Sequence, residues 1–347
     1  MSEKGQTSIT NIYLLAFLLT AITLITVAIF GGPASIIPVL ILAIIEVTFS
    51  FENAVINSQV LARMNQFWQT IFLTVGIAVA VFGVRLLLPV IMVSTTTGHS
   101  MLSVFQMALH EPDQYAALLE NAYPLIAAFG GVFLLMIGLR FFGERRDVYW
   151  LNSVEAPLGE FNQPWWIVFS GIVGAVGFIY LFLANGDLSI VGAAILGGLT
   201  FVVIKGVGEL LMRSNHQTLA GGTAHGLAAL SQFVYLEMLD ASFSFDGVLG
   251  AFAITKDVLL IAAGLGIGAF YVRSLTVHLL RRGTLAHYRY LVHGAHYAIL
   301  VLALMLILSI SLEMPKIIVS LVGLSFIFAA ISSSIRHNHR EALPAKK

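Results

Sequence analysis

Long apolar runs separated by short polar turns dominate the chain. A membrane helix needs about 20 mostly apolar residues, because the hydrocarbon core of a bilayer is roughly 30 Å thick. Such runs lie near 11–30, 34–62, 67–96, 123–142, 165–184, 187–212, 224–255, 257–280, 292–312 and 316–335. Only the tight-turn signal Asn185-Gly186-Asp187 divides the fifth run from the sixth. The pattern predicts an all-α, polytopic membrane protein with about ten transmembrane helices.

Composition narrows the class further. Hydrophobic residues make up 58% of the 347 positions and charged residues only 10%, against about a quarter charged in a typical soluble domain. The lipid bilayer is therefore the expected partner, and the zero net charge gives no indication of nucleic acid. The lack of cysteine excludes disulfides and thiolate metal sites.

The distribution of lysine and arginine predicts the orientation. With ten spans and an inside N-terminus, 13 of the 18 basic residues fall on one side, and Lys256 and Lys316 fall on the other. Arg85, Lys205 and Arg273 remain inside spans. Cytoplasmic loops carry the excess of basic residues. We therefore expect a multi-pass protein of the cell (inner) membrane with both termini in the cytoplasm.

The chain contains an internal repeat. Segments 46–53 and 240–247 both read acid, two residues, Phe-Ser-Phe, acid, and then a residue that tolerates unusual backbone. A second matching pair follows in the same order, because 76–85 and 264–273 share glycine, phenylalanine, valine and arginine at the same offsets. Two ordered matches indicate a duplication rather than a chance similarity.

The duplication predicts how a single membrane domain, 1–347, is laid out. Repeat one covers about 34–142, connecting helices cover about 165–212, repeat two covers about 224–312, and a final helix follows at 316–335. The two motif helices are the second and seventh spans, so they run in opposite directions. Inverted repeats of this kind build many secondary transporters, whose substrate site lies near the bilayer midplane at the repeat interface.

Acidic residues inside the spans are candidates for function, because a carboxylate at mid-membrane costs about 2.5–3.5 kcal/mol. Five lie there: Glu46, Glu52, Glu237, Asp240 and Asp246. Arg85 and Arg273 are each expected near a motif acid, and this leaves a formal excess of three negative charges. That excess must be protonated, hydrated or matched by a bound cation. Lys205 and Glu209, four residues apart, are expected to form a structural ion pair.

Helical spacing groups oxygen donors on two faces. One face of an unbroken helix carries Glu46, Ser50 and Asn53, and another carries Glu237, Asp240 and Ser244. The second acid of each motif turns inward as well if the helix unwinds near Asn53 or Gly247, where the residue type lowers the cost of leaving helical geometry. Carboxylate, hydroxyl and amide oxygens suit hard cations such as Mn²⁺, Mg²⁺ or Ca²⁺.

Other interpretations of these residues stay open. Glu46 and Asp240 can be purely structural partners of the two arginines, although ionisable groups inside a membrane are usually functional. His293 and His296, one helical turn apart, can bind a metal or make interfacial hydrogen bonds, of which the second is the more common role. The chain has no Ser-His-Asp order, phosphate loop or HExxH helix, so we expect no enzyme.

Several short motifs together carry a resemblance to a known family. They are segments 46–55, Phe67-Trp68 followed by Phe72-Leu73 and Gly76, and segments 82–85 and 239–247. The chain resembles the TerC family of integral membrane proteins, and most closely its branch filed as a domain of unknown function, from about 35 to 335. The resemblance implies export of manganese or related divalent ions, or supply of metal to secreted proteins. Carried over by motif, it implies metal ligation by Glu46, Glu52, Asp240 and Asp246.

The combined expectation is a divalent metal cation transporter, a manganese-type exporter that works by alternating access. The transported cation is Mn²⁺, with Mg²⁺ or Ca²⁺ as alternatives, and no tightly bound cofactor is expected. Further ligands would come from Ser50, Asn53, Ser244 and Glu237. The alternative is a non-transporting membrane scaffold or metal-supply factor for secreted metalloproteins.

Reporter fusions test the predicted topology. A reporter joined after Lys347 and one inserted within 143–164 should both report the cytoplasm, because both follow an even number of membrane crossings from an inside N-terminus. Paired phosphatase and fluorescent-protein fusions measure this directly. An extracytoplasmic signal at either position would contradict the inverted repeat, because the two motif helices would no longer run in opposite directions.

Overall fold

The computed structural model describes residues 9–214, 226–252, 254–281, 287–312 and 316–342. These residues form helices and connecting turns, with no strand among them. The chain divides into two compact units, the first made of 1–62, 66–122 and 243–282 and the second of 63–65, 123–242 and 283–347. Two long helices, α7 (Pro112–Phe142) and α11 (Gly226–Ala251), contribute residues to both units.

The first unit contains the first motif and the end of the second. Its other helices are α1 (Ile9–Gly31), η1 (Pro33–Ser35), α2 (Ile36–Phe49), α3 (Phe51–Leu61), α4 (Gln66–Ala78), η2 (Val79–Leu87), α5 (Leu88–Thr97), α6 (Met101–His110) and α12 (Val258–Arg281). Gly98 ends α5 with a φ of 74°, a conformation that glycine adopts without strain. The Ser100 hydroxyl then caps α6 by accepting a hydrogen bond from the Ser103 N–H.

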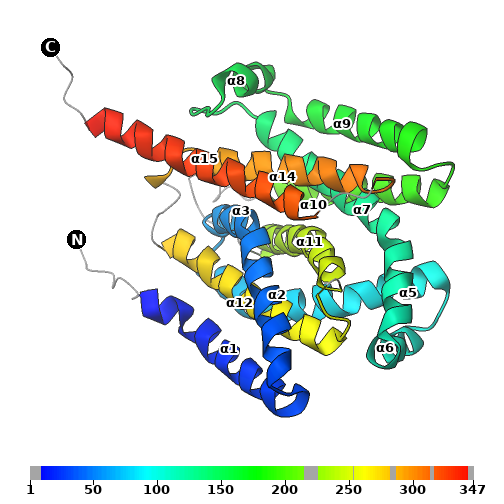
Figure 1. Ribbon diagram of the computed structural model, residues 1–347. Helices are drawn as coiled ribbons and strands as arrows, with labels where there is room; N and C mark the ends of the chain where they lie inside the picture. Colours follow the sequence, from blue (N-terminus) through cyan, green and yellow to red (C-terminus); the bar gives the residue numbers. More distant parts are fainter. Residues whose placement is uncertain (1–8, 215–225, 253, 282–286, 313–315, 343–347) are drawn as a thin grey trace. The chain divides into compact units, whose positions relative to one another are not determined.

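The second unit contains the connecting helices and the C-terminal pair. Its helices are α8 (Asn152–Phe161), α9 (Pro164–Phe178), η3 (Ile179–Leu183), α10 (Leu188–Ser214), α14 (Leu291–Leu308) and α15 (Lys316–Ala342). The turn between η3 and α10 has positive φ at Asn185 and at Gly186, which confirms the turn that the sequence predicts there. Helices α14 and α15 pack side by side along their length (Figure 1).

Close packing of α2 against α12 holds the first unit together, and α1 covers another side of α12 (Figure 1). Two glycines of α12, four residues apart, make the close approach. A Cβ added at Gly264 would lie 2.6 Å from the Leu42 Cβ, and one added at Gly268 would lie 2.4 Å from the Glu46 Cβ. Small residues at this spacing let membrane helices bring their backbones together. Gly268 therefore sets where Glu46 lies.

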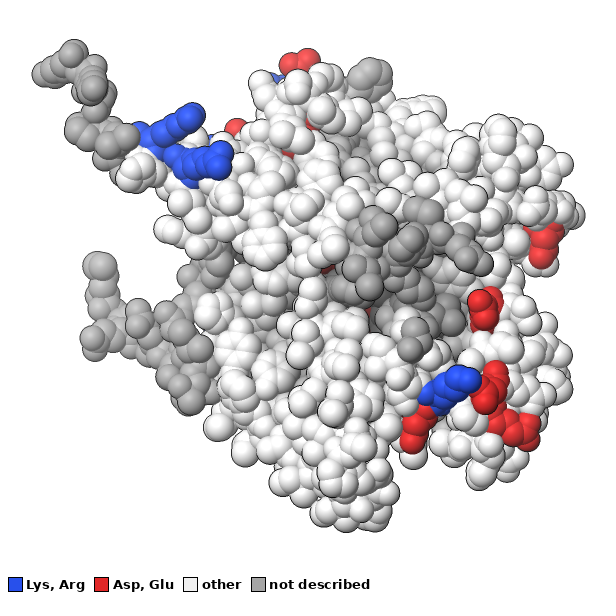
Figure 2. Space-filling model, in the orientation of Figure 1, with Lys and Arg blue, Asp and Glu red and all other residues white. Residues whose placement is uncertain are grey.

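The surface is that of a membrane protein. Large apolar side chains are widely exposed, including Phe30 at 86%, Val173 at 73% and Leu188 at 70%. Uncharged residues also cover most of the face that Figure 2 shows. Exposure on this scale fits a lipid environment, because a soluble protein rarely leaves large apolar areas in water.

Seven helices within the described part of the chain are long and apolar enough to cross a membrane, and the bent pair α2–α3 raises the number to eight. The sequence predicts ten spans. The other two expected spans fall on α11 and α15, which have 26 and 27 residues. Helix α11 has the required length, but three acidic residues lower its apolar character. The structure thus describes an all-helical, polytopic protein, and the count of ten stays a prediction.

Substitution of Gly268 tests the contact between α2 and α12. Gly268→Ala places a methyl group well inside contact distance of Glu46, so we expect a loss of about 1–3 kcal/mol in stability from overpacking. Thermal unfolding in detergent measures this loss. Gly174→Ala is the matched control, because a Cβ there meets nothing within 4 Å. Equal unfolding temperatures for the two variants would contradict the proposed packing.

Candidate cation site

A buried ion pair occupies the centre of the first motif. Arg85 Nη2 donates to Glu46 Oε1 at 2.5 Å, and the two side chains are 2% and 3% exposed. The Ser50 hydroxyl donates to the same carboxylate oxygen at 2.9 Å. Moving a charge out of water costs several kcal/mol, which is offset only by close geometry and additional hydrogen bonds. Arg85 Nη1 provides one more, to the Ala80 carbonyl at 2.7 Å.

Local helix geometry positions Arg85 for this ion pair. Arg85 lies in η2, a π-helical segment within the longer helix that runs from α4 to α5. Pro89, four residues later, has no N–H for the Arg85 carbonyl, and its ring would clash with that carbonyl in a regular α-helix. The wider turn relieves this conflict, and the Leu88 N–H reaches back five residues to the Gly83 carbonyl. Such π-helical turns are frequent at functional sites.

The second copy of the motif lies against the first at Glu46. A Cβ added at Gly247 would be 3.3 Å from Glu46 Oε2, so the backbone that follows Asp246 contacts this carboxylate. Helix α11 stays helical through Gly247 and ends at Ala251. The unwinding near Gly247, which the sequence leaves open, is thus not found in α11. A glycine in this position admits the carboxylate of Glu46 because it has no side chain of its own.

The first motif helix breaks at Ser50, between its two acids. Helices α2 and α3 meet there at an angle of 52°, and Ser50 has φ −101° and ψ 17°. The break lies three residues before Asn53, near which the sequence leaves an unwinding open, and at this point the Ser50 hydroxyl bonds to Glu46 while the Ser50 backbone leaves helical geometry. Glu52 consequently lies in the first turn of α3, where the helix dipole favours a carboxylate. Glu52 is 6% exposed, and Asn53 is fully buried.

Arg273, the counterpart of Arg85 in the second repeat, has a different environment. Its guanidinium lies 3.6 Å from the centre of the Phe72 ring, and Nη2 donates to the Gly76 carbonyl at 3.3 Å. Arginine stacks well on aromatic rings when it is removed from water. Arg273 thereby joins α12 to α4 within the first unit.

The other predicted ligands are distributed as follows. Glu237 and Asp240 are buried on the part of α11 that belongs to the second unit, and they are 8% and 5% exposed. The side chains of Ser244 and Asp246 lie outside the described residues. Among the side chains that the structure describes, no three His, Asp or Glu residues gather closely enough to hold a metal ion. The convergence of the four motif acids thus stays a prediction.

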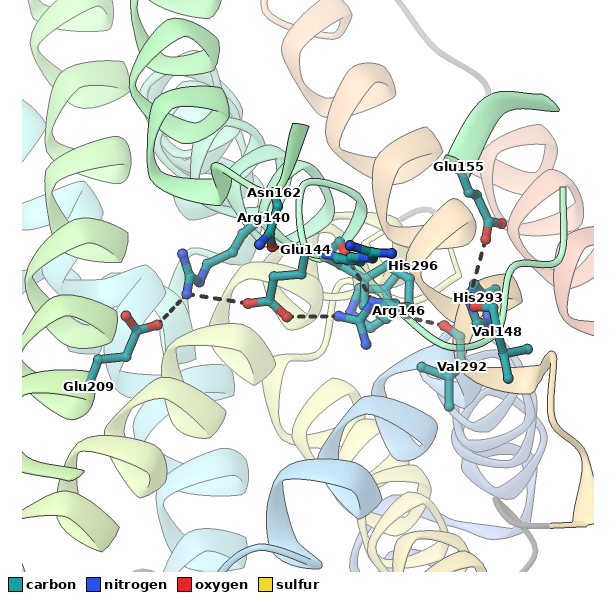
Figure 3. Close-up of polar contacts among 12 residues, drawn as sticks. Arg140, Glu144, Arg146, Val148, Glu155, Asn162, Glu209, Val292, His293 and His296 are labelled. Carbon is teal, nitrogen blue, oxygen red and sulfur yellow. Dashed lines mark hydrogen bonds and ion pairs between the residues drawn. The ribbon is translucent and has the colours of Figure 1, made fainter. Parts of the chain in front are cut away.

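A second network of charges runs through the second unit (Figure 3). Arg140 on α7 bonds to Glu209 on α10 and lies 3.3 Å from Glu144, which in turn bonds to Arg146 at 3.1 Å. Arg140 is thus a partner of Glu209, and the expected pair between Lys205 and Glu209 stays a prediction. Lys205 lies over the Tyr235 ring, 4.0 Å from its centre.

No sequence pattern indicates this role of Arg140, which lies 69 residues from Glu209 along the chain. Trp165 adds to the cluster by donating from Nε1 to Glu209 at 3.2 Å. Burial lowers the pKa of the Arg146 guanidinium from its ordinary value, and the nearby Glu144 carboxylate raises it. The network therefore joins the helix ends of α7 and α10 by charge pairing.

The two histidines take structural positions in the same unit. His293 Nε2 lies 2.9 Å from the Val148 carbonyl and 3.4 Å from the Glu155 carboxylate (Figure 3). Glu155 is 2% exposed and also accepts the backbone N–H groups that precede α8. His296 bonds to the Val292 carbonyl and stacks on the Phe141 ring at 3.6 Å. The contact between His293 and Glu155 joins α14 to α8, and hydrogen bonds and ring stacking account for the two histidines.

A cavity of about 80 Å³ is lined in part by Arg85. Its walls come from α5, α6, α7, α11 and α12, all within the first unit, and include Val90, Phe105, Tyr115, Val248 and Val258. The volume is sufficient for a few water molecules. Arg85 is the charged group in a wall that is otherwise apolar or aromatic.

Comparison with known proteins places these residues in a family. A family model described as "Protein of unknown function (DUF475)" matches residues 51–341. The chain belongs to this family. No curated protein and no solved structure matches the chain. The DUF475 match agrees with the predicted branch of unknown function, whereas the wider relationship to TerC proteins stays a resemblance. The match includes α3, Arg85, Arg273 and the whole of α11.

Substitution of Arg85 tests the buried ion pair. Arg85→Met leaves Glu46 charged and without its cation, so we expect a loss of about 3–5 kcal/mol in stability. Arg146→Met, in a more exposed pair, should cost much less. Thermal unfolding of the purified variants in detergent gives both values. Addition of Glu46→Gln to Arg85→Met should recover part of the loss, and strictly additive losses would contradict direct pairing.

Proposed function

We propose that this DUF475 protein transports a hard divalent cation of the manganese type across the cell membrane by alternating access. The observation that carries the proposal is the position of Glu46. Its buried carboxylate would lie 3.3 Å from a Cβ added at Gly247, so the segments that carry the two similar motifs are neighbours at this point. Transporters with inverted repeats bind their substrates at such a meeting of repeats.

The donor chemistry supports a hard cation. The motif acids Glu46, Glu52, Asp240 and Asp246 provide carboxylates, and hydroxyl and amide oxygens come from Ser50, Ser244 and Asn53. Oxygen-only ligand sets select Mn²⁺, Mg²⁺ or Ca²⁺ over metals that prefer sulfur. Glu237 adds another buried carboxylate on α11. The resemblance to TerC proteins favours Mn²⁺ and favours export.

The pair between Arg85 and Glu46 is compatible with a carrier that changes conformation without a bound cation. Arg85 neutralises Glu46 when the cation is absent, because the guanidinium holds Oε1 at 2.5 Å. A bound divalent cation would replace Arg85 as the partner of this carboxylate. The other motif acids would have to match the remaining charge of the divalent cation and of the displaced guanidinium.

The cavity beside Arg85 supplies access from one side. In the ten-span topology with cytoplasmic termini, α6 and the ends of α11 and α12 that line the cavity lie on the extracytoplasmic side. Water in the cavity would reach the guanidinium that pairs with Glu46. The cytoplasmic side of the path would then be the side that opens and closes.

One observation favours the alternative of a membrane scaffold or metal-supply factor for secreted proteins. Glu46 Oε1 already accepts bonds from Arg85 and Ser50, which is the arrangement of a satisfied structural carboxylate. A scaffold would keep this pair intact in all states. Metal movement by the purified protein separates the two functions.

Isosteric substitutions test the transport function. Glu46→Gln and Asp240→Asn keep the shape and remove the charge, so each should lower Mn²⁺ uptake into proteoliposomes at least about tenfold, since even outer-shell changes cost about 10–100-fold in metal affinity. Mn²⁺ binding by the parent should also weaken as pH falls, because carboxylate ligands must be deprotonated.

Glu160→Gln is the control, because Glu160 is an exposed acid outside the motifs. Uptake by this variant should equal that of the parent. If the parent binds and moves no Mn²⁺, Mg²⁺ or Ca²⁺, the transport function is wrong and the scaffold is preferred. Equal uptake by the parent and both site variants would show that these acids do not form the site.

A further inference from the structure

Helix α3 is too polar for a helix that is almost fully buried. Glu52, Asn53, Asn57 and Ser58 are all buried, although α3 has only 11 residues. Asn53 and Asn57 are 0% and 1% exposed and lie four residues apart, so they share one face of the helix. Packing alone gives no reason for two buried amides on one face.

The Asn57 amide is the unexplained group on this face. Both its Oδ1 and its Nδ2 are buried, and neither has a hydrogen-bond partner among the described residues. The adjacent Ser58 is also buried, but its hydroxyl has a partner within the helix, because it donates to the Val55 carbonyl at 2.7 Å. A buried donor and acceptor without protein partners is costly, and such groups usually face water or an ion.

Asn57 also continues a series of oxygen donors. From Glu46 the donors recur every three or four residues through Ser50 and Asn53 to Asn57. Ser50 connects the series physically, because its hydroxyl bonds to Glu46 and its backbone begins α3. Helix α3 ends at Leu61, two residues before Arg63, which the ten-span topology places in the cytoplasm.

We propose that the Asn53–Asn57 face of α3 forms the cytoplasmic part of the cation's path and that Asn57 is an amide ligand which the cation contacts between the carboxylate site and the cytoplasm. This inference rests on the proposed transport function. The cavity at Arg85 is lined by residues of other helices and by none of α3, so the amide face is separate from it.

The chemistry of an amide suits a position on a path. Its carbonyl oxygen is a neutral ligand for a hard cation, so it replaces part of the hydration shell without adding charge. A carboxylate at the same position would hold the cation more strongly and slow its departure. Asn57 therefore differs in role from Glu46, which provides the charge that attracts the cation.

Three variants in phosphatidylethanolamine–phosphatidylglycerol vesicles, with Mn²⁺ as the probe, test the inference. Asn57→Leu removes both polar atoms at similar size and should lower the initial uptake rate at least about tenfold, which corresponds to about 1.4 kcal/mol. Equilibrium Mn²⁺ binding should stay within about twofold, because the carboxylates are unchanged. Asn57→Asp should bind Mn²⁺ about tenfold more tightly and release it more slowly.

Ser58→Ala is the matched control, because Ser58 is equally buried but bonded within its own helix. Its uptake should equal that of the parent. Uptake at the parent rate by folded Asn57→Leu would overturn the inference and leave the amide as a site for structural water. If that variant does not fold, Asn57→Asp decides, and unchanged Mn²⁺ affinity and rate would overturn it.

A failure of the transport function is separable from a failure of this inference. A parent protein that moves no Mn²⁺ overturns both. A parent that transports Mn²⁺ and loses uptake with Glu46→Gln, but not with either Asn57 variant, overturns the path alone.

Discussion

The packing of the first unit depends on the buried contact between Glu46 and Arg85. Two opposite charges with almost no exposed area remain stable only if the guanidinium and the carboxylate meet closely and their other bonding positions are filled. Three local departures from regular packing achieve this. Pro89 favours the wide helical turn that carries Arg85, Ser50 leaves helical geometry beside Glu46, and Gly268 lets α12 approach α2.

The bend at Ser50 also sets the order of the polar groups along α2 and α3. The bend at Ser50 separates the two acids onto different helices, so Glu46 ends one segment and Glu52 begins the next. After Glu52, which begins α3, the buried polar side chains are the amides of Asn53 and Asn57 and the Ser58 hydroxyl, which bonds within its own helix. A charged centre followed by neutral donors is a physically reasonable sequence for an ion that must be attracted first and released later.

The charge network of the second unit has a different purpose. Arg140, Glu144 and Glu209 connect α7 to α10, and the pair between His293 and Glu155 connects α14 to α8. The Arg140–Glu209 and His293–Glu155 contacts join helices that are far apart in the sequence. We interpret these contacts as the bonds that hold the second unit's helix ends in position.

The sequence by itself determined the features that depend on neighbouring residues. Apolar runs of membrane length indicate a helical membrane protein, Asn185-Gly186 indicates a turn, and the repeated acidic motif marks the residues around Glu46. These signals are local, because hydropathy, turn geometry and motif spacing act over a few residues.

Tertiary structure decided which charged side chains pair with each other and where the first motif helix breaks. Glu209 pairs with Arg140, because packing of α7 against α10 brings a distant guanidinium to this carboxylate. The first motif helix breaks at Ser50, where the serine hydroxyl has a buried acceptor, and α11 stays helical through Gly247. Asn57 gives no signal in the sequence, and only its burial without a protein partner among the described residues distinguishes it. Such choices depend on groups that distant helices bring together, which no local pattern encodes.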